Sequence, residues 1–173
     1  MFQLINKYYL IGGLVILTGY PSAAQKGYDE IDPYKNGMAK VYKQSKIGFI
    51  NEKGEEIIEC RYDFIGDFVN GSAKVSINKK YGYISVADQI LVPIKYDFIG
   101  PFKNGIAIVS LRGRVGLVDN RGDEIVPLIY DEISQFNNKG LAKVRIKRLE
   151  GIINRVGEEV VPVYKPKEPD EEE

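Results

Sequence analysis

Histidine and tryptophan are both absent from the 173 residues of this chain. Without histidine there is no imidazole for a Ser-His-Asp triad, for a proton shuttle or for a histidine metal ligand. These absences exclude the commonest catalytic and metal-binding arrangements. The sequence therefore predicts no catalytic, cofactor-binding or metal-binding residues, and no cofactor.

Cysteine occurs once, at Cys60, so the chain has no partner for an internal disulfide and no second sulfur ligand for a structural zinc ion. A nucleophilic thiol needs a neighbouring base to activate it, and histidine is not available for that role. We therefore expect Cys60 to be a half-buried apolar side chain.

Neither sign of charge is in excess, since Lys plus Arg and Asp plus Glu each number 24. Non-specific binding of nucleic acid depends on an excess of positive charge, so a nucleic acid is not an expected partner. The apolar fraction of 44% and the charged fraction of 28% are ordinary for a domain that folds in water.

The first 24 residues have the three parts of a secretory signal peptide. Residues 1–7 carry one positive charge and no acid, residues 8–20 are mostly apolar, and small residues end the segment at Ala23 and Ala24. The apolar stretch is shorter than the ~18–20 residues that a membrane-spanning helix needs. We expect cleavage after Ala24, export to the periplasm, the cell surface or the medium, and no stable membrane insertion afterwards. An uncleaved anchor or a first helix of the domain is the alternative.

From residue 28 onward the chain repeats itself every 34 residues, with one inserted residue in the last copy. Such a period is typical of repeat arrays, solenoids and propellers. The copies span 28–61, 62–95, 96–129 and 130–164. Each begins with a Tyr-Asp dyad and later carries a single glycine, and an Asn-Gly pair lies between them in the first three copies. The aligned residues are Tyr28, Tyr62, Tyr96 and Tyr130 in the dyads, Asn36, Asn70 and Asn104 in the pairs, and Gly48, Gly82, Gly116 and Gly151.

Within a copy, apolar and polar residues alternate with a period of two, which is typical of half-buried strands. Two such strands joined by a short polar turn predict a hairpin, and an apolar pair, followed by proline in three copies, predicts a short third strand that the proline ends. The sequence thus predicts an all-β fold, a tandem array of four roughly three-stranded antiparallel units, solenoid-like or open propeller-like. The eight longer strands are expected at 38–43, 47–51, 72–78, 81–86, 106–111, 115–119, 141–146 and 151–154.

The sequence predicts different structural roles for two kinds of glycine. The Asn-Gly pairs predict tight turns, because both residues tolerate a positive φ. The single glycines, such as Gly82 and Gly116, predict a close approach of backbone or a bend in the second strand, so Gly82→Val and Gly116→Val are expected to destabilise the fold.

The order of these residues resembles the WG repeat of bacterial proteins. The second copy shows it as Tyr62-Asp63, Phe68, Asn70-Gly71, Ala73 with Val75, Gly82-Tyr83-Ile84 and Leu91-Val92-Pro93. The residue before the repeat glycine is Ile47, Tyr81, Val115 or Glu150 instead of tryptophan, and three of these four keep a large apolar side chain for packing. The resemblance implies a β-rich repeat scaffold, often secreted or surface-associated and generally without known catalysis. It implies no ligand.

Three recurring features are candidate binding groups. The dyads are expected to pack the seam between copies through Tyr and to accept backbone N–H groups through Asp, and the alternative is an exposed ladder for a sugar or a peptide. Arg121-Gly122-Asp123 spells an integrin-recognition tripeptide but occupies a repeat turn. Basic turns are expected to be solvated, with a positive stripe facing an acidic surface as the alternative. They are Lys79-Lys80, Arg112 with Arg114, and Lys147-Arg148.

Residues 165–173 are rich in acids and proline and are expected to be a disordered tail. The leading functional hypothesis is a non-enzymatic repeat scaffold in the bacterial envelope that binds an unknown protein or glycan. The alternative is an envelope enzyme or an enzyme-inhibitor module, which two unlike carboxylates in one cleft would favour.

Overall fold

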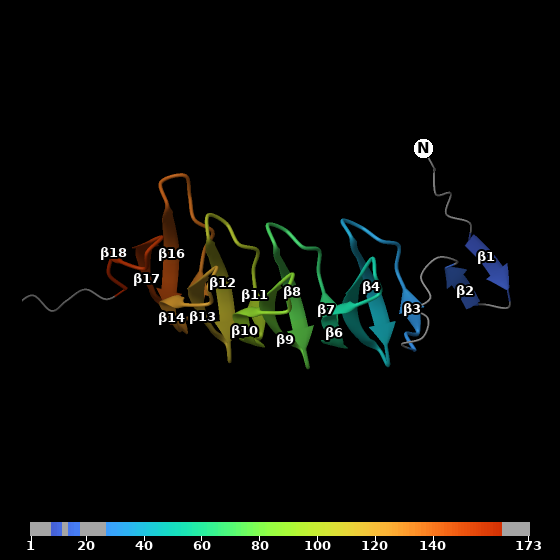
Figure 1. Cartoon of the computed structure of the whole chain (residues 1–173). Helices are drawn as coiled ribbons and strands as arrows, with labels where there is room; N and C mark the ends of the chain where they lie inside the picture. The colour runs from blue at the N-terminus through green and yellow to red at the C-terminus, as the bar shows by residue number, and fades with distance from the viewer. Residues whose placement is uncertain (1–7, 12–13, 18–26, 164–173) are drawn as a thin grey trace, which may run out of the picture. The chain divides into compact units, whose positions relative to one another are not determined.

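The computed structural model describes the backbone of residues 8–11, 14–17 and 27–163, and the side chains of residues 27–163 (Figure 1). Every regular secondary-structure element within these ranges is a β-strand. None of the described residues forms a helix that could cross a membrane. The expected cleavage site after Ala24 and the expected tail at 165–173 lie outside the described residues. By its internal contacts the chain divides into unit 1, Met1–Asn78 with Ile84–Gln89, and unit 2, Lys79–Tyr83 with Ile90–Glu173.

Two short strands lie within the apolar N-terminal stretch. Strands β1 (Tyr8–Ile11) and β2 (Leu14–Leu17) pair antiparallel, with Tyr8 opposite Leu17.

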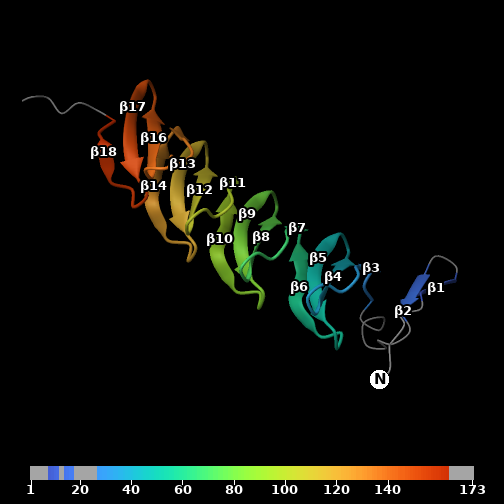
Figure 2. The same ribbon diagram turned by 90° about the horizontal axis from the view of Figure 1, so that it is seen from above.

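Each copy of the repeat forms one four-stranded antiparallel sheet whose strands follow the order of the chain (Figure 2). The predicted strands of each copy are present, the eight longer ones to within two residues, and a strand of two residues precedes them directly after the dyad. The first sheet holds β3 (Glu30–Ile31), β4 (Met38–Lys43), β5 (Lys46–Asn51) and β6 (Glu56–Tyr62), and the second holds β7 (Phe64–Ile65), β8 (Ser72–Ile77), β9 (Lys80–Ser85) and β10 (Ile90–Tyr96). The third holds β11 (Phe98–Ile99), β12 (Ile106–Leu111), β13 (Arg114–Asp119) and β14 (Glu124–Tyr130), and the fourth holds β15 (Glu132–Ile133), β16 (Leu141–Ile146), β17 (Leu149–Asn154) and β18 (Glu159–Val161).

The Asn-Gly pairs form the tight turns that the sequence predicts. In the third copy Asn104 has a φ of 52° and Gly105 a φ of 79°. The flanking residues exchange backbone hydrogen bonds, since the Lys103 N–H donates to the Ile106 carbonyl at 2.9 Å and the Ile106 N–H donates back at 3.2 Å. Two consecutive positive φ values closed in this way make a two-residue hairpin turn.

The expectation that the closing proline ends strand pairing is wrong for Pro93 and Pro127, which lie inside β10 and β14. In the third sheet Leu117 pairs with Val126 and Val115 pairs with Tyr130, so β14 bulges between these two pairs. Because Pro127 lies in the bulge, its missing N–H removes no regular ladder bond and the strand resumes beyond it.

The repeat glycine of the neighbouring strand, Gly116 in β13, faces this bulge. A Cβ atom on Gly116 would lie 2.6 Å from the Val126 carbonyl oxygen, far inside contact distance. Gly48, Gly82 and Gly151 would meet the equivalent carbonyl oxygens at 2.4, 2.5 and 2.7 Å. The predicted close approach of backbone is therefore confirmed in all four copies.

The core of unit 2 lies between the sheet of one copy and the last strand, β10 or β14, of the sheet before it. In unit 2, Val92 and Tyr96 of β10 are buried together with Ala107 and Val109 of β12. The next cluster repeats this arrangement with Val126, Tyr130, Ala142, Val144 and Ile153. Successive copies therefore bury the apolar faces that a single sheet would expose.

Candidate functional site

Three of the four dyad tyrosines are buried, and Tyr28 is half-buried. Tyr62 and Tyr96 are fully buried and Tyr130 is 3% exposed. Each hydroxyl donates a hydrogen bond to a carboxylate of its own copy, Tyr28 to Glu56, Tyr62 to Asp88, Tyr96 to Glu124 and Tyr130 to Glu159. Burial, together with the bond to Asp88, raises the pKa of Tyr62 to about 12. The expectation that the dyad tyrosines pack the seam is confirmed for Tyr96 and Tyr130, which are buried among residues of two copies. The three buried tyrosines offer no ring to a ligand.

The dyad aspartates cap the hairpin turns, as expected. One oxygen of Asp63 accepts the Asn78 N–H at 2.6 Å, and one oxygen of Asp97 accepts the Arg112 N–H at 2.7 Å. Asn78 and Arg112 both have a positive φ. The aspartate therefore fixes a turn that leaves the preferred backbone region.

The second oxygen of these aspartates binds a cation of the preceding copy, a contact that was not predicted from the sequence. The pairs are Lys46 with Asp63, Lys80 with Asp97 and Arg114 with Asp131. A basic residue recurs every 34 residues at these positions, and this repetition could have predicted the pairs from the sequence. The bond to the lysine, with the turn N–H, lowers the pKa of Asp63 and of Asp97.

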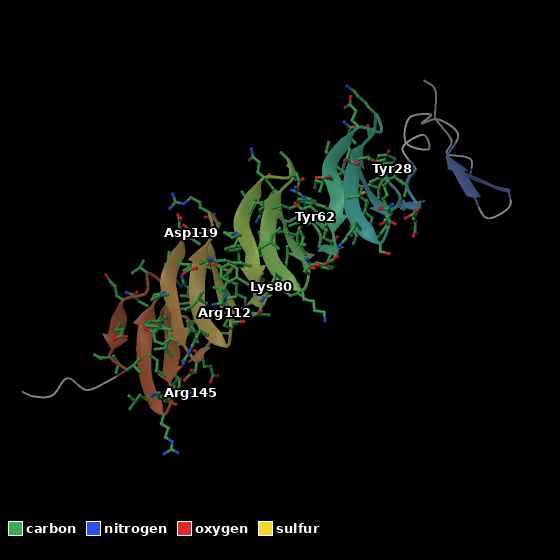
Figure 3. All side chains as sticks on the ribbon, turned by 90° about the horizontal axis from the view of Figure 1, so that it is seen from below. Tyr28, Tyr62, Lys80, Arg112, Asp119 and Arg145 are labelled. Atoms are coloured by element: carbon green, nitrogen blue, oxygen red, sulfur yellow. The ribbon has the colours of Figure 1, made fainter. Side chains whose placement is uncertain are left out.

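This pairing changes the interpretation of the basic turns. In unit 2, Lys80, Arg112 and Arg145 lie toward one end of the strands and Asp119 toward the opposite end (Figure 3). Lys80 and Arg114 are paired with aspartates, and Arg145 is paired with Glu132 at 2.8 Å. Of the six basic-turn cations, Lys80 and Arg114 are therefore paired with aspartates across copies, whereas the other four, Lys79, Arg112, Lys147 and Arg148, are exposed.

The Arg121-Gly122-Asp123 tripeptide forms the repeat's own turn. One Asp119 oxygen accepts the backbone N–H groups of Arg121 and Asp123 at 2.8 and 3.0 Å. Gly122 has a φ of 87°, and a Cβ on it would lie 2.5 Å from the Leu91 carbonyl oxygen. The glycine is thus explained by turn geometry and by contact with the preceding copy.

Cys60 is half-buried, as expected, and its Sγ lies 3.8 Å from the Val41 carbonyl oxygen. Burial raises the pKa of the thiol, which disfavours the reactive thiolate. Within the part of the chain that the structure describes, no group of three His, Cys, Asp or Glu side chains is placed to hold a metal ion.

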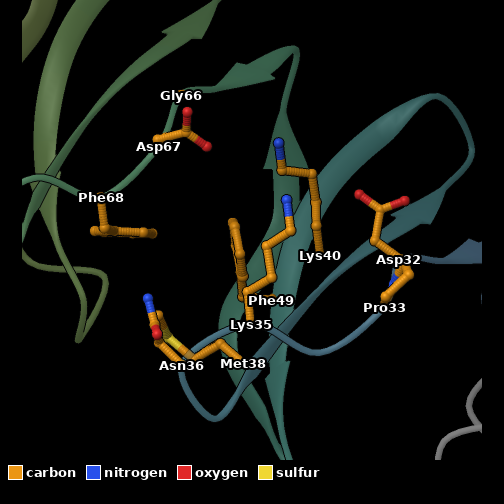
Figure 4. Close-up of a pocket in the computed structure, with 10 residues that line it drawn as sticks. All are labelled: Asp32, Pro33, Lys35, Asn36, Met38, Lys40, Phe49, Gly66, Asp67 and Phe68. Atoms are coloured by element: carbon orange, nitrogen blue, oxygen red, sulfur yellow. The ribbon is translucent and has the colours of Figure 1, made fainter.

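A groove of about 510 Å³ lies between the first and second copies, inside unit 1 (Figure 4). Its apolar wall contains Phe49 and Phe68, whose rings meet edge to face with centroids 5.6 Å apart. The Lys40 ammonium lies 5.9 Å from the centre of the Phe49 ring and donates to the Ile65 carbonyl at 3.2 Å. The charged residues of the lining are Asp32, Lys35, Lys40 and Asp67.

A groove of about 260 Å³ lies at the equivalent place between the third and fourth copies, inside unit 2. Pro101, Lys103, Asn104 and Phe136 occupy the positions of Pro33, Lys35, Asn36 and Phe68, 68 residues earlier. The Lys103 ammonium donates to the Gln135 side-chain oxygen at 3.1 Å. The other lining residues are Phe98, Gly100, Ile106, Ile108 and Arg155.

None of these groove residues was predicted from the sequence to form a binding site. The available signal was an aromatic residue in every copy, at Tyr34, Phe68, Phe102 and Phe136, and a lysine shared by the first and third copies at Lys35 and Lys103.

A family model described as WG containing repeat matches the chain four times, at residues 24–46, 47–81, 81–114 and 116–148. No curated protein matches the sequence. The four matches cover more than half of the chain, and they agree with the repeated sheets, the hairpin glycines and the dyads described above. The chain belongs to the WG containing repeat family.

Proposed function

We propose that this chain is a non-enzymatic repeat scaffold of the bacterial envelope that binds a protein or a glycan through the grooves between its copies. The supporting observation is that two grooves occupy equivalent places, in unit 1 and in unit 2, and share a proline, a lysine, an asparagine and a phenylalanine. An aromatic wall with a polar rim is the usual make-up of a recognition site.

The carboxylates of the grooves support binding over catalysis. A carboxylate-based hydrolase needs two acids that their surroundings drive to different pKa values. Asp32 and Asp67 both line the first groove, but Asp67 is exposed, and the second groove has Gly100 and Gln135 at these positions. Because the acids are not a shared feature of the grooves, they do not define a common catalytic pair.

Export is supported by the basic, apolar and small-residue segments of residues 1–24. Mass spectrometry of the protein from its producing cells is expected to find an N-terminus at Gln25 on the exported form. An intact Met1 on correctly localised protein would contradict the export step.

Binding is tested with immobilised chain of residues 25–173 and two probes, an envelope protein extract and a panel of soluble envelope glycans. Lys35→Ala with Lys103→Ala changes the rim of both grooves, and Lys79→Ala with Arg112→Ala is a charge-matched control at exposed positions outside them. We expect capture by the wild type and the control, and a loss of about tenfold in affinity for the groove variant, equivalent to about 1.4 kcal/mol. Equal capture by all three proteins would contradict the proposal.

A further inference from the structure

The two grooves share an architecture but differ in charge. The lining of the first groove holds two acids, Asp32 and Asp67, and two cations, Lys35 and Lys40, so its formal charge is two minus two, or zero. The lining of the second groove holds two cations and no acid, so its formal charge is +2. Those cations are Lys103 and Arg155.

We propose that the second groove binds a carboxylate-bearing sugar ring of an acidic glycan, with the carboxylate between Lys103 and Arg155. This inference rests on the proposed function and specifies its ligand at one of the two grooves. The chain as a whole is neutral, so the selection for an anion is local to this groove.

Both cations have free donors for a carboxylate. The Lys103 ammonium has three N–H donors, and its bond to Gln135 at 3.1 Å uses one of them while holding the group at the rim. The Arg155 side chain lies against Gly140, where a Cβ would come within 3.4 Å of its Nε. The guanidinium is planar and presents two parallel N–H groups to a carboxylate, which makes it the stronger partner for this group.

The rest of the lining suits the body of a sugar ring. Phe98 is 50% exposed, and together with Phe136 it gives the groove aromatic surface for the C–H face of a ring. Asn104 and Gln135 add amide groups that can bond hydroxyls. At about 260 Å³ the groove is smaller than the usual ligand pocket of about 300–1,000 Å³, so it fits one ring of a longer chain.

A nucleic acid fits this site less well. Single-stranded nucleic acid is bound by a positive groove that follows several phosphates, whereas this groove offers two cations over the space of one ring. An acidic peptide would supply the carboxylate but not the ring, and it serves as a competitor in the test.

The test uses calorimetric titration of the chain of residues 25–173 with oligogalacturonate and with its methyl ester, which has the same rings without the charge. We expect the ester to bind at least about tenfold more weakly. Raising the salt concentration is expected to weaken the binding of the acidic oligomer and to leave the binding of the ester unchanged. Equal affinity for the two forms would overturn the proposal.

Variants locate the site. Lys103→Gln with Arg155→Gln is expected to abolish the preference for the acid, and Lys79→Gln with Arg112→Gln, which removes two exposed cations outside both grooves, is the matched control and is expected to keep it. Lys103 and Arg155 are both exposed, and circular dichroism checks that the fold is intact. A variant of Lys103 and Arg155 that keeps the preference overturns the proposal, as does polyglutamate that competes as strongly as oligogalacturonate. If the chain shows no preference for the acidic oligomer but still captures an envelope component, the inference fails and the proposed function stands. If the chain captures nothing, the proposed function fails.

Discussion

Two residues of the second copy depart from the repeat together. Asp88 stands where the other copies have a turn glycine, and Ile90 stands where they have a glutamate that accepts the dyad hydroxyl. Asp88 takes over both roles, because it adopts a φ of 58° in the turn and accepts the hydroxyl of Tyr62. It also pairs with Arg61 at 2.9 Å. The second copy therefore satisfies its buried tyrosine by a different route.

A double-mutant cycle tests this exchange. Asp88→Gly relieves the positive φ but leaves the buried Tyr62 hydroxyl without its acceptor, and a hydrogen bond to a charged group contributes about 1.5–3 kcal/mol. We expect Asp88→Gly to lower the free energy of unfolding, and Ile90→Glu added to it to restore much of the loss, as measured by urea denaturation. Additive effects of the two changes would show that Ile90 and Asp88 are unrelated.

The close approach at Gly116 gives a second test at the residue scale. A Cβ on Gly116 would lie 2.6 Å from a backbone carbonyl, whereas a Cβ on Gly100, in the same copy, would find its nearest neighbour at 3.6 Å. We expect Gly116→Ala to cost about 2 kcal/mol or more of stability, and Gly100→Ala to change it by less than about 0.5 kcal/mol. Equal denaturation midpoints for the two variants would contradict the geometry.

At the scale of the element, the dyad aspartate at the hairpin turn of the second, third and fourth copies makes two bonds, one to the turn and one to a cation. In unit 2, Asp97 caps the turn at Arg112 and also binds Lys80 of the preceding copy. One residue thus fixes its own turn and binds its copy to the preceding one, which explains the dyad aspartate of the second, third and fourth copies. Asp29 of the first copy has the capping role, since it accepts the Gln44 N–H at 2.6 Å.

The lowered pKa of Asp63 and of Asp97 predicts that the fold loses stability in acid. Lys80 and the Arg112 N–H hold the pKa of Asp97 below its ordinary value. A carboxyl whose pKa is lower in the folded state stabilises the fold above its unfolded pKa of about 3.9, and that contribution is lost as the pH falls through the folded value. We expect urea midpoints to fall below about pH 4, and to fall less steeply for Asp97→Asn. A variant that follows the wild-type profile would contradict this role, and the exposure of the site makes the expected difference small.

The sequence predicted those elements that depend on local chemistry. Asn104-Gly105 forms its turn because both residues accept a positive φ, and Gly116 is required because its own strand faces the bulge of the next. The run of β14 through Pro127 was not predicted, because only the pairing beyond the bulge shows that the strand resumes. The pair Lys80 with Asp97 and the groove around Lys103 were also missed, because each joins two copies and depends on how one copy follows another.

At the scale of the whole molecule, the repeat places equivalent residues in equivalent surroundings, and differences between copies become informative. The fourth copy has Leu149, which is 53% exposed, where the first three have Lys46, Lys80 and Arg114 to bind the next dyad. The departures at Gly100 and Gln135 likewise give one groove a charge that the other lacks.

The central claim is that the copies are stabilised by one another, and it is tested most directly by chemical denaturation of Gly48→Val, Gly82→Val, Gly116→Val and Gly151→Val. All four glycines face a carbonyl oxygen at 2.4–2.7 Å from a would-be Cβ, so the local strain of each change is alike. Copies inside an array share their core with two neighbours and terminal copies with one. We therefore expect losses on the order of 2 kcal/mol or more, with the larger shifts in midpoint at Gly82 and Gly116. Equal losses at all four positions, or the smallest at Gly82 and Gly116, would contradict the account.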